Sequence, residues 1–336
     1  MKERKILIVS AAAICIVCAV AGWLLGRFAF NRKASVDQVV TTAQVRANLS
    51  QFKFINPTLY TDGPSDTSPA YLSFKSSLDS YISAAEEAKK ASDISVYFRD
   101  LNTGRWIGDN ENDLYRPSSM LKVLTTMSAL TIAQSDPAFL QKELPYQATD
   151  HSDQYYKPAQ TLSTGDHSVQ ELINAMVIDS DNDALHSLDS DQQISSTFDS
   201  LYSLFRLPAA TATSTDFMSP KSYSALFRVL YNSSLFPWSL SEQVLDLLSH
   251  TSFSKGLVAG VPEGTPVSHK FGENTAVATD GTIVERELHD CGIVYYPNDP
   301  YLVCVMTKGQ DFSVLETVIS DISKMAYGFV KGNQGN

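Results

Sequence analysis

The sequence predicts an α+β domain in which strands from both ends of the folded part build one antiparallel sheet. The segment 94–100, "ISVYFRD", alternates as a strand near the start, and "VSHKFG", "HDCGIVYYP" and "YLVCVMTKG" read as strands near the end. Between about residues 119 and 249, the apolar residues recur with helical spacing instead. We therefore expect an antiparallel sheet flanked by helices, with an inserted all-helical lobe.

Two amphipathic segments at the ends of the body supply helices to cover this sheet. Residues 71–91 place apolar side chains at helical spacing before the first strand, and "SVLETVISDISKMAYGFV" does so after the last one. Within the lobe, "VQELINAMVI" and "PKSYSALFRVLYNSS" have the clearest helical pattern. The order along the chain is therefore helix, hairpin, helical lobe, three strands and a final helix.

Composition and charge describe an acidic, globular protein. The chain has 336 residues, of which 43% are hydrophobic and 19% charged, and its formal net charge is −11. Six of its 26 Lys and Arg residues lie in the first 33 residues, so the remainder is more acidic still. A nucleic-acid partner is excluded on these grounds, because its phosphates would be repelled.

The N-terminal 33 residues form a segment of a different kind. Twenty uncharged residues, Ile6–Leu25, follow a basic start, which predicts a single membrane anchor. A cleaved signal peptide is the alternative, because "AVA" at 19–21 has the form of a cleavage site. Equal numbers of Lys and Arg residues lie before and after the span, so the charge distribution does not predict which side of the membrane the folded domain occupies. The expected function has to decide it. Residues 34–70 are polar and read as a tether, followed by the folded domain at 71–332.

The cysteines argue against a zinc site. Cys15 and Cys18 lie within the apolar N-terminal run, and no second Cys pair or His pair accompanies them. We expect neither a metal nor a cofactor. Cys291 and Cys304 fall on adjacent predicted strands; if Pro297 pairs with Pro300, the two cysteines are offset by one diagonal step. A disulfide and a pair of buried free thiols both remain open.

The stretch "RPSSMLKVLTTM" carries the first chemical signal. Pro117 suits the first turn of a helix and we expect Ser118 to cap it, which would place Ser119 at the positive end of that helix. Lys122 follows one turn later, on the same face, with Cβ atoms about 5–6 Å apart. A lysine held in an apolar setting loses its proton readily and can activate a serine hydroxyl.

Two later stretches strengthen this signal. Ser180-Asp181-Asn182 follows a helical segment, and Lys270-Phe271-Gly272 ends a strand just after the helical lobe. S-x-x-K, S-D-N and K-T-G, in this order, are the motifs of class A β-lactamases and penicillin-binding proteins. The sequence resembles this family from about residue 94 to 330, with the third motif imperfect. The resemblance implies a β-lactamase/transpeptidase-like fold.

The resemblance also implies roles for individual residues. Ser119 would be the acylated nucleophile, Lys122 its activating neighbour, and Ser180 a proton relay to the leaving nitrogen. Backbone N–H groups of Ser119 and Glu273 would form the oxyanion hole.

Substrate binding would fall to the second and third motifs. Asn182 would hold the substrate amide, and Lys270 would attract a substrate carboxylate. Gly272, in the same motif as Lys270, would also belong to the substrate-binding residues.

The sequence also departs from the family. Class A enzymes deacylate with a glutamate that follows S-D-N, but no glutamate occurs between Glu171 and Glu242. The corresponding loop has Asp216 as its carboxylate, close to Pro220, where we expect a helix cap. Phe271 removes a hydroxyl from the third motif, and the Glu273 carboxylate would repel an anionic substrate.

Two histidines are alternative bases. His269 neighbours Lys270 on the opposite strand face, and His289 begins a strand, so we interpret both as structural. No G-x-S-x-G element supports a Ser-His-Asp hydrolase.

Together with the N-terminal apolar segment, the resemblance implies a membrane-anchored serine hydrolase with an extracytoplasmic catalytic domain, acylated by β-lactam-like amides. We expect a monomer, although no sequence pattern determines the oligomeric state. The partners would be a β-lactam or cell-wall peptide and, through the N-terminal helix, the membrane. Two alternatives remain open: a D,D-peptidase or penicillin-binding protein acting on peptidoglycan stems, and a degenerate member that binds the cell wall without turnover. If the signal is cleaved, the protein would be secreted.

Overall fold

A computed structural model describes residues 52–57, 65–152, 154–211 and 214–333. The expected anchor at 6–25 and most of the tether lie outside these residues. Among the described helices, none is both long and apolar enough to cross a membrane. Proposals about the membrane therefore rest on the sequence.

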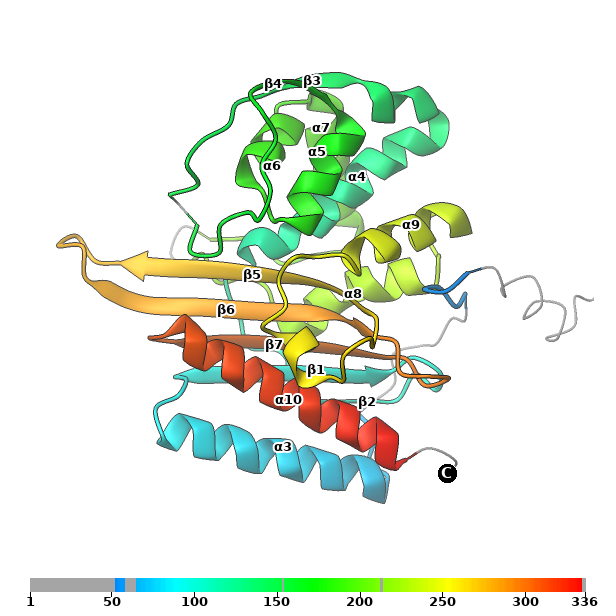
Figure 1. The fold of residues 1–336 in the computed structure, drawn as a ribbon. Coiled ribbons are helices and arrows are strands. Elements are labelled where there is room, and N and C mark those ends of the chain that lie inside the picture. Colours follow the sequence, from blue (N-terminus) through cyan, green and yellow to red (C-terminus); the bar gives the residue numbers. More distant parts are fainter. Residues whose placement is uncertain (1–51, 58–64, 153, 212–213, 334–336) are drawn as a thin grey trace, which may run out of the picture. The chain divides into compact units, whose positions relative to one another are not determined.

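A five-stranded antiparallel sheet forms the centre of the folded part (Figure 1), in the order β2-β1-β7-β6-β5. The first two strands come from the start of the folded part and the other three from its end, as the sequence predicts. Their bounds are β1 (Asp93–Asp100), β2 (Trp106–Asp109), β5 (Val267–Val277), β6 (Ile283–Val294) and β7 (Tyr301–Gly309).

Alternation along the strands divides the core between the two faces of the sheet. On β1, Ile94, Val96 and Phe98 pack into the cluster formed with helices α3 (Pro69–Glu87) and α10 (Phe312–Gly332). Tyr97, between them, belongs to the cluster on the lobe side. Figure 1 shows α3 and α10 together beside the sheet, and the lobe on its other side. The sheet is buried on both faces, which explains its nearly continuous apolar strands.

The lobe contains six helices among the described residues, together with a short ribbon that the prediction of an all-helical lobe missed. The ribbon pairs residues 143–146 with 165–168, and its polar, four-residue strands carry too little pattern to be recognised. The elements are α4 (Lys122–Ser135), β3 (Glu143–Tyr146), β4 (Gly165–Ser168), α5 (Val169–Ile178), α6 (Asn182–Asp189), α7 (Gln192–Leu204), α8 (Pro220–Tyr231) and α9 (Trp238–Leu248).

Side-chain caps start four helices of the lobe, α5, α6, α7 and α8. Ser168 and Glu171 form a reciprocal capping box at the start of α5, and Asp181 caps α6. The expectation for Asp216 was wrong: Ser219 caps α8, and Asp216 instead forms an ion pair with Lys308 of β7. This pairing across the fold could not be read from local sequence.

Cys291 and Cys304 form a disulfide between β6 and β7. The register with Pro297 opposite Pro300 was wrong, because Val294 is the residue that opposes Tyr301. The connection is therefore six residues long, which places the two cysteines directly opposite each other. Both are fully buried. The bond joins two neighbouring strands of the central sheet.

Candidate active site

The candidate nucleophile lies on a tight turn in front of α4. Ser119 belongs to a 3₁₀ helix, Ser118–Leu121, and α4 begins only at Lys122. The prediction that Ser118 caps the helix was wrong, because its φ is +48° and no side-chain cap bond forms. A left-handed backbone at a non-glycine residue is strained and is common at functional sites.

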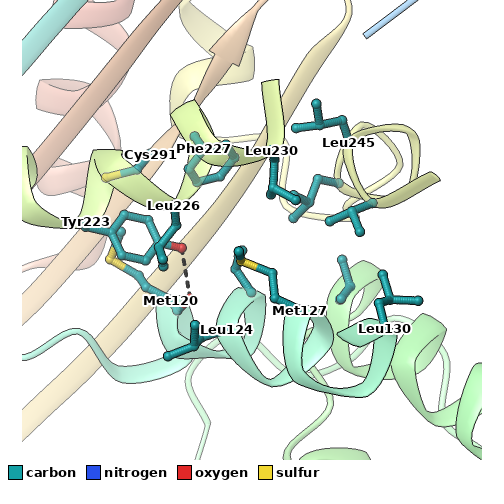
Figure 2. Close-up of a cluster of buried hydrophobic side chains, with 14 of the residues drawn as sticks. Met120, Leu124, Met127, Leu130, Tyr223, Leu226, Phe227, Leu230, Leu245 and Cys291 are labelled. Carbon is teal, nitrogen blue, oxygen red and sulfur yellow. Dashed lines mark hydrogen bonds between the residues drawn. The ribbon is translucent and has the colours of Figure 1, made fainter. Parts of the chain in front are cut away.

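A buried cluster holds this turn in place (Figure 2). The Tyr223 hydroxyl of α8 donates a 2.8 Å hydrogen bond to the Met120 carbonyl oxygen. Met120, Leu124 and Met127 pack with apolar residues of α8 and α9 in the same cluster. Fixing the turn from the core side leaves Ser119 only partly buried.

Strand β5 passes directly along the nucleophile turn. A Cβ added at Gly272 would lie 2.6 Å from the Pro117 carbonyl oxygen and 2.8 Å from Met120 Cγ. The backbones are therefore as close as a glycine permits. This contact brings the third motif next to Ser119, where the backbone N–H groups of Ser119 and Glu273 are expected to bind an oxyanion.

We expect Gly272→Ala to disrupt this contact. The new methyl would collide with a backbone oxygen that cannot rotate away, so β5 or the turn must shift, at a cost of about 1–3 kcal/mol in stability. Acylation of Ser119 should fall by at least about 100-fold, because one lost oxyanion donor costs that much. Urea unfolding and acylation rates check both effects. Gly328→Ala on α10, where an added Cβ meets nothing within 4 Å, is the control, and an equal loss in both variants would contradict the role of Gly272.

Two buried lysines converge on the Ser180 hydroxyl. Lys270 Nζ lies 2.9 Å from Ser180 Oγ, and Lys122 Nζ lies 3.3 Å from the same atom. The exposed fractions of Lys122 and Lys270 are 1% and 0%. The structure thus brings together one residue of each of the three motifs, as the resemblance implies.

Burial strongly affects the charge of Lys270. Desolvation lowers the pKa of Lys270 well below its ordinary value, and the nearby charge of Lys122 lowers it further. The carboxylates of Asp290 and Glu273 oppose this shift. Two ammonium groups sharing one hydroxyl in a dry site repel each other, so one amine is readily deprotonated and can accept a proton.

The S-D-N segment is shaped to receive the Lys122 amine. The φ of Ser180 is +57°, and its carbonyl oxygen accepts a 2.6 Å hydrogen bond from Lys122 Nζ. Asn182 Oδ1 accepts another from the same amine at 2.7 Å. Asn182 therefore positions Lys122 here, in addition to the substrate contact expected of it.

No sequence motif indicates that strand β3 and the loop between β3 and β4 contribute to the site. Gln154 donates a 3.1 Å hydrogen bond to the Ser180 carbonyl oxygen, and the Tyr146 hydroxyl donates one of 2.8 Å to Asp181 Oδ2. These residues have no spacing relation to the motifs, so no local signal identifies them. The loop therefore supports the backbone of the S-D-N motif through Gln154.

Phe271 and Glu273 make contacts that differ from substrate binding. The Phe271 ring stacks on Phe253, with centroids 4.2 Å apart, and lies edge-on to Tyr156. Glu273 Oε1 accepts a 2.9 Å hydrogen bond from the Tyr156 backbone N–H. Desolvation raises the pKa of Glu273, whereas the N–H groups of Tyr156 and Tyr155 and the charges of Lys122 and Lys270 lower it. Glu273 thereby fastens the β3–β4 loop to β5.

The histidines considered as bases have structural contacts. His269 Nδ1 lies 2.7 Å from Asp290 Oδ1, and its Nε2 lies 2.6 Å from Thr251 Oγ1. His289 lies within β6 rather than at its start, and its Nε2 faces the Arg116 carbonyl oxygen at 3.1 Å. Both rings are buried with partners on the sheet.

Several solved structures have a fold similar to that of this chain, and three of them are described here. A point mutant of PBP-A, solved as an acyl-enzyme complex with penicillin G, aligns with a TM-score of 0.64 and 17% identity, covering 80% of this chain and 100% of that one. The TLA-3 extended-spectrum β-lactamase aligns with a TM-score of 0.63 and 19% identity, covering 75% and 98%. A class A β-lactamase from Bacteroides cellulosilyticus gives 0.63 and 18%, covering 77% and 99%. No curated protein matches the sequence.

The fold and the arrangement of the three motifs define a protein of the β-lactamase/transpeptidase-like class. The chain belongs to the Beta-lactamase enzyme family, whose family model matches residues 77–330. Membership confirms the resemblance drawn from the motifs.

Proposed function

We propose that this protein is a serine hydrolase that forms an acyl-enzyme at Ser119 with β-lactam-like amides. The observation that carries the proposal is the convergence of Lys122 and Lys270 on Ser180 Oγ, beside the turn that bears Ser119. Related proteins of this fold include PBP-A, a mutant of which forms an acyl-enzyme with penicillin G.

In the proposed reaction, Ser119 Oγ attacks the amide carbonyl carbon as its proton passes to an amine of the Lys122–Lys270 pair. The tetrahedral oxyanion is stabilised by the N–H groups of Ser119 and Glu273. Ser180, hydrogen-bonded to both lysines, then delivers a proton to the leaving nitrogen as the C–N bond breaks. The product is an ester on Ser119 and a free amine.

Slow deacylation is part of this proposal. No glutamate lies between Glu171 and Glu242, and the Asp216 side chain is engaged by Lys308. Without a carboxylate base for the attacking water, the ester should persist, as in a penicillin-binding protein. This favours, as the second candidate, a D,D-peptidase or transpeptidase acting on peptidoglycan stems at the outer face of a membrane that holds the N-terminal anchor.

Intact-mass spectrometry of the full chain with a penicillin tests the proposal. We expect the mass to rise by one penicillin, the adduct to map to Ser119, and Ser119→Ala to abolish it. Slow decay of the adduct together with release of D-alanine from a stem-peptide mimic would identify a peptidase, whereas fast decay would identify a β-lactamase. The absence of any Ser119 adduct with penicillins and activated esters would leave the degenerate, wall-binding alternative.

A further inference from the structure

A cluster of three buried polar side chains includes the aspartate of the S-D-N motif, and none of the three is assigned a step in the proposed acylation. A ring nitrogen of His151 and a carboxylate oxygen from each of Asp181 and Asp183 all lie within 4.8 Å of one another. Their exposed fractions are 4%, 0% and 7%. The histidine comes from the β3–β4 loop, and the two aspartates come from the first turn of α6 and its cap.

The side chain of His151 is the member of the cluster without a hydrogen-bond partner. Neither ring nitrogen makes a hydrogen bond, although both are buried. Its Nε2 points at Asp183 Oδ2 from 3.5 Å, a distance too long for a good hydrogen bond. Its φ of +50° is a strained conformation for a histidine, so the loop holds the ring toward the aspartates at an energetic cost.

The two carboxylates lack a strong counter-charge. Among the ion pairs of the described residues, neither Asp181 nor Asp183 is matched by a lysine or an arginine; His151 is the single cationic candidate. Buried carboxylates are normally paired or bind a metal, because desolvating an isolated charge is costly.

We propose that His151, Asp181 and Asp183 form a binding site for a divalent transition metal, with Zn²⁺ as the best match. One imidazole nitrogen and two carboxylate oxygens form the donor set of a three-ligand zinc site that has one further position for water. Zinc ligands bound at about 2.1 Å lie about 3–4 Å from one another. The side chains therefore need only a small inward movement.

The surroundings of the cluster support coordination. Asp181 Oδ1 accepts N–H groups of Asp183 and Ala184, while Tyr146 donates to Oδ2. Asp183 Oδ2 accepts the Thr149 N–H at 2.8 Å. Ligating carboxylates are characteristically oriented by such outer hydrogen bonds.

A route to the site also exists. A cavity of about 280 Å³ is lined by Thr149, Asp183 and His186, among others. It reaches the cluster at Asp183, so a hydrated ion can approach from this side and keep one water. Cysteine spacing excludes only a cysteine-ligated zinc site. Because His151 lies 30 residues before Asp181, no local motif in the sequence marks these three residues.

Calorimetric titration of the EDTA-treated full chain with ZnCl₂ tests the site. We expect one equivalent of Zn²⁺ to bind and to raise the thermal midpoint. His151→Ala and the nearly isosteric Asp183→Asn should each weaken binding by more than about 100-fold, and Tyr146→Phe by about 10–100-fold, as for an outer partner. His250→Ala, which removes an exposed histidine just after α9, should leave binding unchanged.

Co²⁺ supplies a readout that does not depend on stability. Its visible absorption should show one tightly bound ion of low coordination number, and this band should disappear in His151→Ala and Asp183→Asn. Circular dichroism without metal checks that both variants are folded. Absence of Zn²⁺ binding to the wild-type protein, or undiminished binding to a folded His151→Ala, would overturn the proposal. Since no step involves Ser119, failure here is independent of failure of the hydrolase.

Discussion

Acylation of Ser119 should slow by about 1,000-fold when Lys122 is replaced by methionine. The amine is buried and bonded to Ser180 and Asn182, so its loss removes a proton acceptor beside the nucleophile, a function worth about 10²–10⁴ in rate. Stopped-flow acylation by a chromogenic cephalosporin measures this rate at saturating substrate.

Lys122→Arg separates proton transfer from charge. Arginine keeps the charge and the donors but does not lose a proton near neutral pH, so acylation should be nearly as slow as in Lys122→Met. Lys324→Met, on an exposed part of α10, is the matched control and should react as the wild type does. Acylation of the arginine variant within tenfold of wild type would exclude Lys122 as proton acceptor.

Lys270→Met should produce opposite effects on activity and stability. Acylation should fall by at least about 100-fold, because Ser180 Oγ loses its closest donor and the substrate loses a positive charge. The free energy of unfolding at pH 7 should rise by about 2 kcal/mol, because replacing a buried charge with an apolar side chain of similar volume is often stabilising. Urea unfolding beside the acylation assay measures both.

The stability gain should depend on pH in a defined direction. The pKa of Lys270 in the folded protein is lowered by desolvation and by Lys122, whereas in the unfolded chain it is about 10.4. Between these two pKa values the unfolded chain binds the extra proton, so wild-type stability rises with pH. The advantage of Lys270→Met should therefore be greatest below the folded pKa and shrink as the pH approaches about 10.4. Lys324→Met should show no such trend, and a gap that widens with pH would contradict a lowered pKa.

The parts of the fold that follow from local pattern were predicted well. The segment "VQELINAMVI" corresponds to α5, and the three late strand-like runs became β5, β6 and β7. The main residues of the site could also be predicted, because S-x-x-K, S-D-N and the third motif contain the side chains that meet at Ser180. Periodicity and motif order are carried by neighbouring residues, which is why a single sequence reveals them.

The errors arise where distant segments determine local structure. The disulfide depends on a register set by a six-residue connection, and Asp216 is drawn from a helix start to Lys308 on another strand. Ser118 was read as a cap, but β5 and Tyr223 hold its turn in a 3₁₀ conformation instead. The contributions of Gln154 and Tyr156 depend on how one long loop folds back over the site. None of these features is marked by a local sequence motif.

The position of β1 in the sheet constrains how the protein is made. Asp100 of β1 pairs with Tyr301 of β7, at the centre of the sheet. At about 5–20 residues per second, a ribosome finishes β7 about 10–40 s after β1. During that interval, the apolar residues of β1 lack their central neighbour and the sheet stays incomplete. Folding therefore waits for nearly the whole chain, and the nascent protein depends on protection from aggregation until its last strand arrives.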